Sequence, residues 1–230
     1  MIMSKSFSGH TKVGRNILHN IEQRLIQRYS RWIPLWLETY HLTLMTIIWS
    51  VGTIGFGYLA RSSWHWLWGT AVMIILQYLT DLFDGAIGRQ RNTGLVKWGY
   101  YMDHFLDYIF LCALLIGYAF VIPNKFFNMY FFILAILGAF MVNSYLAFAA
   151  SNRFRIAFFG IGPTEVRLIF LVVNVLLIIF GKTYLAWTLP GILIISTLGL
   201  IVTVYSTQQE LWLLDMREKS KLPNKNNNES

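Results

Sequence analysis

Six long stretches of the chain carry few or no charged residues, and they constrain its fold more than any other feature. They are residues 42–60, 62–80, 108–124, 126–152, 156–181 and 183–209. A helix of roughly 20 apolar residues spans the hydrocarbon core of a bilayer. Charged residues make up 13% of the chain, whereas soluble domains contain about 25%. We therefore predict an all-α integral membrane protein with six transmembrane helices, the fifth of which carries Glu165 and Arg167 near its start.

The N-terminal segment, residues 1–36, lacks the apolar core of a signal peptide but shows a helical repeat. Hydrophobic residues recur at helical spacing, with arginines near or on the other faces: Ile17, Ile21, Leu25, Tyr29 and Trp32. This pattern favours an amphipathic helix in the membrane interface, and a cytosolic helix packed on a partner is the alternative. Residues 37–214 would form the six-helix transmembrane domain. The composition of residues 215–230 is typical of a disordered tail.

Basic residues are distributed unevenly between the two sides of the predicted helices. Of the 19 Lys and Arg residues, all but Arg61, Lys125 and Lys182 fall on the side that holds both termini. The positive-inside rule then places both termini in the cytoplasm. Membrane orientation therefore accounts for the net charge of +8, and no nucleic-acid partner is needed to explain it. The single cysteine, Cys112, excludes a disulfide framework.

Four aspartates lie close together where the second and third predicted spans meet. Asp81 and Asp84 are at positions i and i+3 of one helix, so they share a face. Asp103 and Asp107 are at positions i and i+4 of the next helix and also share a face. The short connection predicts antiparallel neighbouring helices with both pairs at the same depth. Carboxylates near a bilayer are costly unless protons or cations neutralise them. Four of them favour hard divalent cations, Mg²⁺ or Mn²⁺, and we expect two ions.

Glycines and one arginine accompany these aspartates. Gly85 and Arg89 follow the first pair, and Gly99 precedes the second pair by one helical turn. Glycine permits close approach of a ligand to the backbone. Arginine stays charged and can bind two phosphate oxygens at once. Together with a metal ion, these residues favour a diphosphate site beside the bilayer.

The segments DLFDGAIGR, residues 81–89, and GYYMDHFLD, residues 99–107, resemble the signature of the CDP-alcohol phosphotransferase family. All four aspartates, both framework glycines and the arginine occur in the family's order. Gly88 stands where alanine is usual, and one additional residue separates Arg89 from Gly99. The resemblance implies a membrane enzyme of phospholipid synthesis. It would transfer a substituted phosphate from a CDP-linked donor to an alcohol and release CMP.

The resemblance also implies roles for the acidic residues. Asp81, Asp84 and Asp103 would be metal ligands. Asp107 would be a further ligand, or the general base that activates the acceptor hydroxyl. His104 would assist as a base, or only make a local hydrogen bond at the helix end. Because family members commonly dimerise, the resemblance implies a homodimer.

Other parts of the resemblance concern the sites of the nucleotide and of the acceptor. Gly85, Arg89 and Gly99 would line the site of the CDP moiety. The D-H pair at 103–104 and the T-E-V element at 164–166 are similar to the choline and ethanolamine phosphotransferase branch. That branch implies CDP-choline or CDP-ethanolamine as donor and diacylglycerol as acceptor. The other option is a CDP-diacylglycerol donor with a polar acceptor such as inositol phosphate, glycerol phosphate or serine.

Two other classes of protein also place carboxylates in a membrane. An intramembrane prenyltransferase binds a prenyl diphosphate through Mg²⁺, but we expect two separate aspartate-rich elements in a longer chain. A cation carrier would hold carboxylates at mid-bilayer or show an internal repeat. Neither pattern is evident in this sequence, so both remain as disfavoured alternatives.

Charged residues in and just after the connection between the fourth and fifth predicted spans leave several interpretations open. Glu165 and Arg167 would contact the acceptor head group or pair with residues across the cytoplasmic mouth. Arg153 and Arg155 would bind a phosphorylated acceptor or only anchor the protein at the membrane. The chain of 230 residues is short for a eukaryotic member of the branch. It therefore favours a prokaryotic cytoplasmic (inner) membrane, with the active site facing the cytoplasm.

Overall fold

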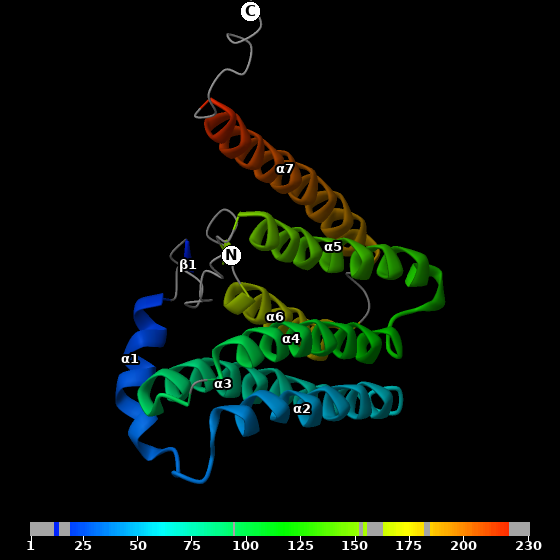
Figure 1. Ribbon diagram of the computed structural model, residues 1–230. Helices are drawn as coiled ribbons and strands as arrows, with labels where there is room; N and C mark the ends of the chain where they lie inside the picture. Colours follow the sequence, from blue (N-terminus) through cyan, green and yellow to red (C-terminus); the bar gives the residue numbers. More distant parts are fainter. Residues whose placement is uncertain are drawn as a thin grey trace, which may run out of the picture.

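Helices form nearly all of the computed structural model, which describes residues 12–13, 19–93, 95–151, 154–155, 163–181 and 185–220 (Figure 1). The helices are α1 (His19–Tyr29), α2 (Thr39–Leu59), α3 (Leu67–Arg91), α4 (Val96–Ala119), α5 (Phe127–Ser151), α6 (Pro163–Phe180) and α7 (Leu185–Lys219). Single 3-10 turns lie at Ser30–Trp32, Trp64–Trp66 and Asn124–Phe126. The two-residue strands β1 (Lys12–Val13) and β2 (Phe154–Arg155) pair in parallel. The predicted all-α class is confirmed apart from this short pair.

Five helical segments of the described residues are long and apolar enough to cross a membrane. They are Thr39–Leu59, Trp64–Arg91, Val96–Ala119, Asn124–Ser151 and Thr188–Lys219. The remaining predicted span corresponds to α6, which has 18 residues and carries Glu165 and Arg167 close to its start. The preceding part of that predicted stretch, residues 156–162, lies outside the described residues. An integral membrane protein is therefore supported, while six spans remains a prediction.

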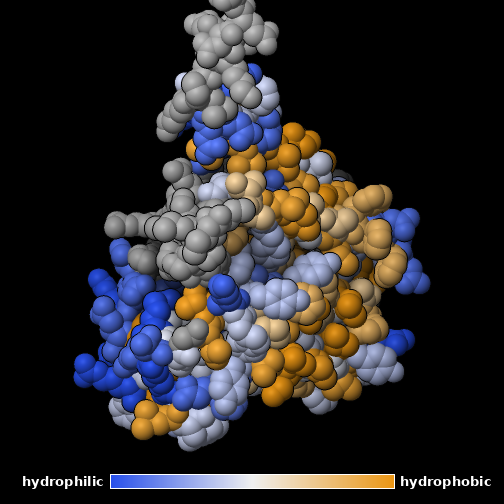
Figure 2. All heavy atoms as spheres, viewed as in Figure 1, coloured by the Kyte–Doolittle hydropathy of each residue, from blue (hydrophilic) through white to orange (hydrophobic). Residues whose placement is uncertain are grey.

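The outer flanks of these helices are apolar. Figure 2 shows hydrophobic side chains over the flank of the helices, whereas hydrophilic ones gather at the end where α1 lies. Large exposed hydrophobic residues include Ile48 on α2, Phe131 on α5 and Ile195 on α7. Exposing apolar surface to water costs about 25 cal/mol per Å². We therefore expect these flanks to face lipid.

Helix α2 packs against both α3 and α4. Small hydroxyl side chains recur along its buried face: Thr39, Thr43, Thr46, Ser50 and Thr53. Such residues let helices approach closely within membranes. Further along α2, a Cβ on Gly57 would lie 2.5 Å from the Cα of Gly117 on α4. The two backbones are therefore in direct contact at this crossing.

Helices α3 and α4 run antiparallel, as predicted (Figure 1). Asn92 ends α3 with a left-handed φ of 50°, a conformation that asparagine tolerates better than most residues. Among the described residues, however, the backbones of α3 and α4 each pack closely on α2 rather than on one another. The two helices are therefore antiparallel neighbours through their side chains, as the Gln77–Asp107 hydrogen bond shows, although their backbones do not pack closely. Both helices pack on the face of α2 that carries small residues. Side chains of α3 and α4 then contact each other across the wider space between the two backbones.

A buried asparagine fixes the position of α6 against α3 and α4. Asn174 Nδ2 donates to the backbone oxygen of Leu67 at 2.8 Å, and Tyr118 OH donates to Asn174 Oδ1 at 3.2 Å. Unpaired amides are costly away from water, so these bonds favour one position of α6. Helix α7 packs on α5, and together they form a separate layer beside the other helices (Figure 1).

Helix α1 crosses the ends of the bundle helices, and Arg91 links the segment after it to α3 (Figure 1). The Arg91 guanidinium donates to four backbone oxygens, of which Leu37 O is the nearest at 2.8 Å; the others are those of Ile33, Pro34 and Leu35. The predicted N-terminal helix is present as α1 and the following 3-10 turn. Its place in the membrane interface stays a prediction, and residues 1–11 and 14–18 lie outside the described residues.

The C-terminal helix is longer than predicted. Helix α7 continues to Lys219, past residue 214, where we expected a disordered tail to begin. Arg217 and Lys219 lie in its last turn, where positive charge interacts favourably with the helix dipole. Residues 221–230 lie outside the described residues.

Candidate active site

Three carboxylates from two helices converge at one end of the bundle, which we call the aspartate end. Asp81 lies on α3, and Asp103 and Asp107 lie on α4. One oxygen from each lies within 4.8 Å of the others. Because Asp103 and Asp107 share a face of α4, and α3 runs antiparallel to α4, the three side chains reach the same level. The spacing in the sequence therefore anticipated this meeting.

Arg167 of α6 bridges two of these carboxylates. Its Nη1 donates to Asp81 Oδ2 at 2.6 Å, and its Nη2 donates to Asp107 Oδ1 at 2.7 Å. Gln77 Nε2, one turn before Asp81 on α3, also donates to Asp107 Oδ1 at 3.0 Å. Arg167 is only 9% exposed, so these charge-assisted bonds are shielded from water. Of the roles left open for Arg167, the structure shows pairing with acidic residues.

Asp84 lies on the same helix as Asp81 but outside the group of three. It is 7% exposed, and Thr43 Oγ1 of α2 donates to its Oδ2 at 2.9 Å. The same threonine hydroxyl lies 3.1 Å from the backbone oxygen of Thr39. Asp84 therefore extends the acidic face of α3 and is held in place by α2.

His104 lies beside the cluster and is held by aromatic and polar contacts. Its Nδ1 is 3.0 Å from Asp103 Oδ2. The ring centroids of Tyr100 and Tyr145 are 4.4 Å and 5.7 Å from that of His104. Tyr145 OH also donates to the backbone oxygen of His104 at 3.0 Å. An imidazole in this position could exchange a proton with a group bound at the carboxylates.

The predicted nucleotide-binding residues lie on the parts of α3 and α4 that flank the turn between them. Arg89 is exposed, and its Nη1 lies 3.3 Å from the place that a Cβ on Gly85 would occupy. A side chain at position 85 would therefore press on this guanidinium. Around a Cβ built on Gly99, no described atom beyond its own turn lies within 4 Å. A ligand can thus approach the backbone closely at Gly99, whereas the Arg89 guanidinium already lies against Gly85.

The donor atoms at the aspartate end fit a hard divalent cation. Mg²⁺ binds carboxylate oxygens and usually retains water or phosphate ligands as well. The carboxylates outnumber the one arginine that pairs with them in the described part of the chain: they are Asp81, Asp103 and Asp107, with Asp84 beside them. Like charges at this spacing repel unless a cation neutralises the excess. The residues could therefore hold a metal ion.

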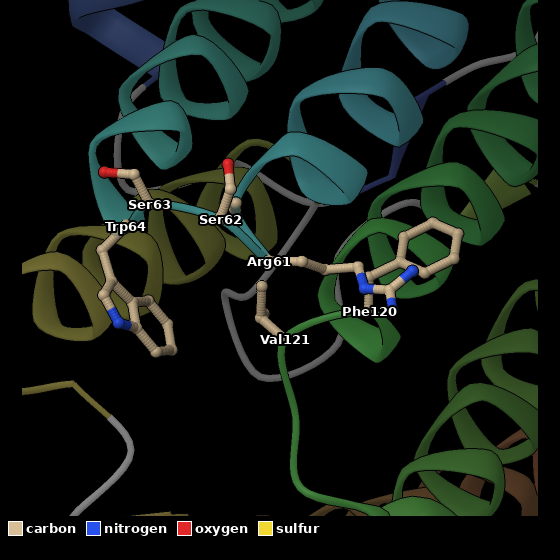
Figure 3. A pocket seen from close by; sticks show the side chains of 7 residues that line it. Arg61, Ser62, Ser63, Trp64, Phe120 and Val121 are labelled. Carbon is tan, nitrogen blue, oxygen red and sulfur yellow. The ribbon is translucent and has the colours of Figure 1, made fainter.

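A pocket of about 280 Å³ lies at the opposite end of the bundle, between the turn after α2 and the end of α4. In Figure 3 the Arg61 side chain extends toward Phe120, whereas Ser63 and Trp64 project to the other side. The polar groups of this pocket do not converge on one point. The candidate active site is therefore the aspartate end.

Sequence reasoning missed two residues that hold the aspartates, Gln77 and Thr43. Each is a polar residue within an otherwise apolar span, which indicates a side chain facing other helices. The sequence did not reveal which partner each would meet. Glu165 is half-buried on α6. Arg153 and the side chain of Arg155 lie outside the described residues.

Comparison with known proteins agrees with this geometry. A family model described as CDP-alcohol phosphatidyltransferase matches residues 36–205. A search of curated proteins finds no match. The matched segment contains all four aspartates and Arg167, and it covers most of the chain. The chain therefore belongs to the CDP-alcohol phosphatidyltransferase family, whose members are phosphotransferases that transfer a phosphate group from a CDP-alcohol to an alcohol.

Proposed function

We propose that this protein transfers a substituted phosphate from a CDP-linked donor to an alcohol, with release of CMP, as a metal-dependent step of phospholipid synthesis. The convergence of Asp81, Asp103 and Asp107 carries this proposal, because they come from both segments of the family signature. Membership of the family favours this activity over a prenyltransferase or a cation carrier.

Asp81, Asp84, Asp103 and Asp107 are the proposed ligands of two Mg²⁺ or Mn²⁺ ions. When bound, such ions would neutralise charge on the diphosphate and on the departing CMP. The three convergent carboxylates have the oxygen chemistry that such an ion requires. Asp84, oriented by Thr43, extends the ligand set along the same helix face.

Gly85, Arg89 and Gly99 are the proposed CDP-binding residues. Gly99 leaves space beside the backbone, where the nucleotide could approach, and Gly85 leaves room for the Arg89 guanidinium. The exposed Arg89 guanidinium would form paired hydrogen bonds to phosphate oxygens.

Asp107 and His104 are the two candidates for the base that takes the proton of the acceptor hydroxyl. Asp107 Oδ1 already accepts hydrogen bonds from Arg167 and Gln77, so its position is fixed. The variants Asp107→Asn and His104→Gln distinguish the candidates. Loss of turnover with unchanged metal affinity identifies a base, whereas loss of metal affinity identifies a ligand.

We further propose that the aspartate end faces the cytoplasm of a prokaryotic inner membrane and that the protein is a homodimer. The distribution of basic residues supports the orientation, because most Lys and Arg residues lie on the side of the predicted spans that includes the aspartate end. The histidine that follows Asp103 favours CDP-choline or CDP-ethanolamine as donor, with diacylglycerol as acceptor. CDP-diacylglycerol with a polar alcohol is the alternative pairing.

A donor-by-acceptor matrix in detergent tests the activity, with CMP release and the mass of the lipid product as readouts. We expect CMP release only with Mg²⁺ or Mn²⁺, and a loss of about 100-fold or more in Asp84→Asn. Asp215→Asn is the matched control, because Asp215 is exposed on α7 outside the cluster. Wild-type rates in chelator or in Asp84→Asn would refute the metal assignment. Diphosphate release from a prenyl diphosphate, without CMP release from any donor, would favour a prenyltransferase.

A further inference from the structure

Arg167 already neutralises two of the carboxylates that we propose as metal ligands. Its two terminal nitrogens lie 2.6 Å and 2.7 Å from oxygens of Asp81 and Asp107. We propose that Arg167 is an internal counter-ion, which holds Asp81 and Asp107 together while the metal site is empty and releases them when a divalent cation binds. This inference rests on the metal-dependent function proposed above.

Charge and burial indicate that Arg167 and a divalent cation would compete for the same two carboxylates. A guanidinium and a divalent cation at the same two carboxylates would repel each other. Because Arg167 is 9% exposed, water screens that repulsion poorly. Asp107 Oδ1 also accepts a hydrogen bond from Gln77, so Arg167 is not its sole donor. Asp107 can therefore give up the guanidinium and still remain oriented.

Helix α6 can keep its position while this exchange takes place. Asn174 lies two turns after Arg167 on the same face of α6 and is fully buried. Its bonds to Leu67 O and from Tyr118 OH hold α6 independently of the aspartates. The long arginine side chain can therefore move without displacement of the helix.

An alternative role for Arg167 is that of a fixed support, which orients the ligands while the metal is bound. Removal of an orienting partner lowers metal affinity by roughly 10- to 100-fold. Removal of a competing cation raises it. The two roles therefore predict changes of opposite sign in one measurable quantity.

Mn²⁺ binding to the purified full-length protein, followed by electron paramagnetic resonance of free Mn²⁺, tests the proposal. We expect Arg167→Gln to bind Mn²⁺ at least tenfold more tightly than wild type does. Arg167→Lys should show a smaller increase, because lysine keeps the charge but lacks the fork of donors. Arg61→Gln is the matched control and should leave the affinity unchanged, since Arg61 is exposed at the opposite end of the bundle.

Thermal unfolding provides a second readout. In chelator, Arg167→Gln should unfold at a lower temperature than wild type, because its carboxylates then lose the positive charge and the two hydrogen bonds of Arg167. In Mn²⁺ the two midpoints should coincide. A lower midpoint of the variant under both conditions would identify a permanent support and overturn the proposal.

The outcomes separate this inference from the proposed function. If wild type binds Mn²⁺ but Arg167→Gln binds it equally or more weakly, the counter-ion role is refuted and the metal site stands. If wild type binds no Mn²⁺, both are refuted. Should Arg167→Gln fail to fold, the sign of the affinity change in Arg167→Lys decides.

Discussion

Thr43 gives the most specific test of how the aspartate end is held together. Its hydroxyl donates to Asp84 Oδ2 at 2.9 Å and so connects α2 to the acidic face of α3. The substitution Thr43→Val keeps the shape of the side chain and removes this donor. Asp84 is 7% exposed, so water replaces the donor poorly. A hydrogen bond to a charged group contributes about 1.5–3 kcal/mol, which corresponds to a factor of roughly 10 to 150.

We expect Thr43→Val to weaken Mn²⁺ binding and to slow CMP release by factors within that range. The reason is that Asp84 would be less well oriented as a ligand. Thr53→Val is the matched control, because Thr53 is fully buried on α2 and its hydroxyl donates to the backbone oxygen of Trp49 at 2.8 Å. Thr43→Ser should retain most of the activity, since serine keeps the hydroxyl. Mn²⁺ dissociation constants and CMP release rates are measured side by side.

Two results would contradict this reasoning. Equal losses in Thr43→Val and Thr53→Val would show that any hydroxyl on α2 matters and that the bond to Asp84 is not special. A loss in Thr43→Ser as large as that in Thr43→Val would show that the methyl group, rather than the hydroxyl, is the important part of Thr43.

Two further predictions concern contacts elsewhere in the helical bundle. Gly57→Ala should lower the unfolding midpoint, because its Cβ would meet the Gly117 backbone at 2.5 Å and overpacking costs about 1–3 kcal/mol. A Cβ at position 55 meets no described atom within 4 Å, so Gly55→Ala should not lower the unfolding midpoint. Equal midpoints of the two variants in scanning fluorimetry would argue against the helix contact. Arg91→Gln should speed tryptic cleavage after Arg31, because four backbone oxygens lose their donor; unchanged cleavage would contradict this role.

Much of the fold and of the site was predictable from local patterns. The uncharged stretches identified the helices that are long enough to cross a bilayer, because the thickness of the hydrocarbon sets their length. The spacing of Asp103 and Asp107 placed both on one face of a helix, because the helical period is constant. Antiparallel helices joined by a short turn then brought Asp81 to the same level. The chemistry of the cluster followed from the residue types alone.

Helix-to-helix contacts were decided only by the tertiary structure. The sequence showed that Thr43, Gln77 and Arg167 are polar residues within apolar surroundings, but not that all three bond to the aspartates. It also could not show that Gly57 packs against Gly117 within the chain. The helical period determines which face a residue occupies, whereas packing over many separated residues determines which faces meet. The sequence thus determined the acidic face and its chemistry, and the tertiary structure decided that an arginine from α6 would neutralise it.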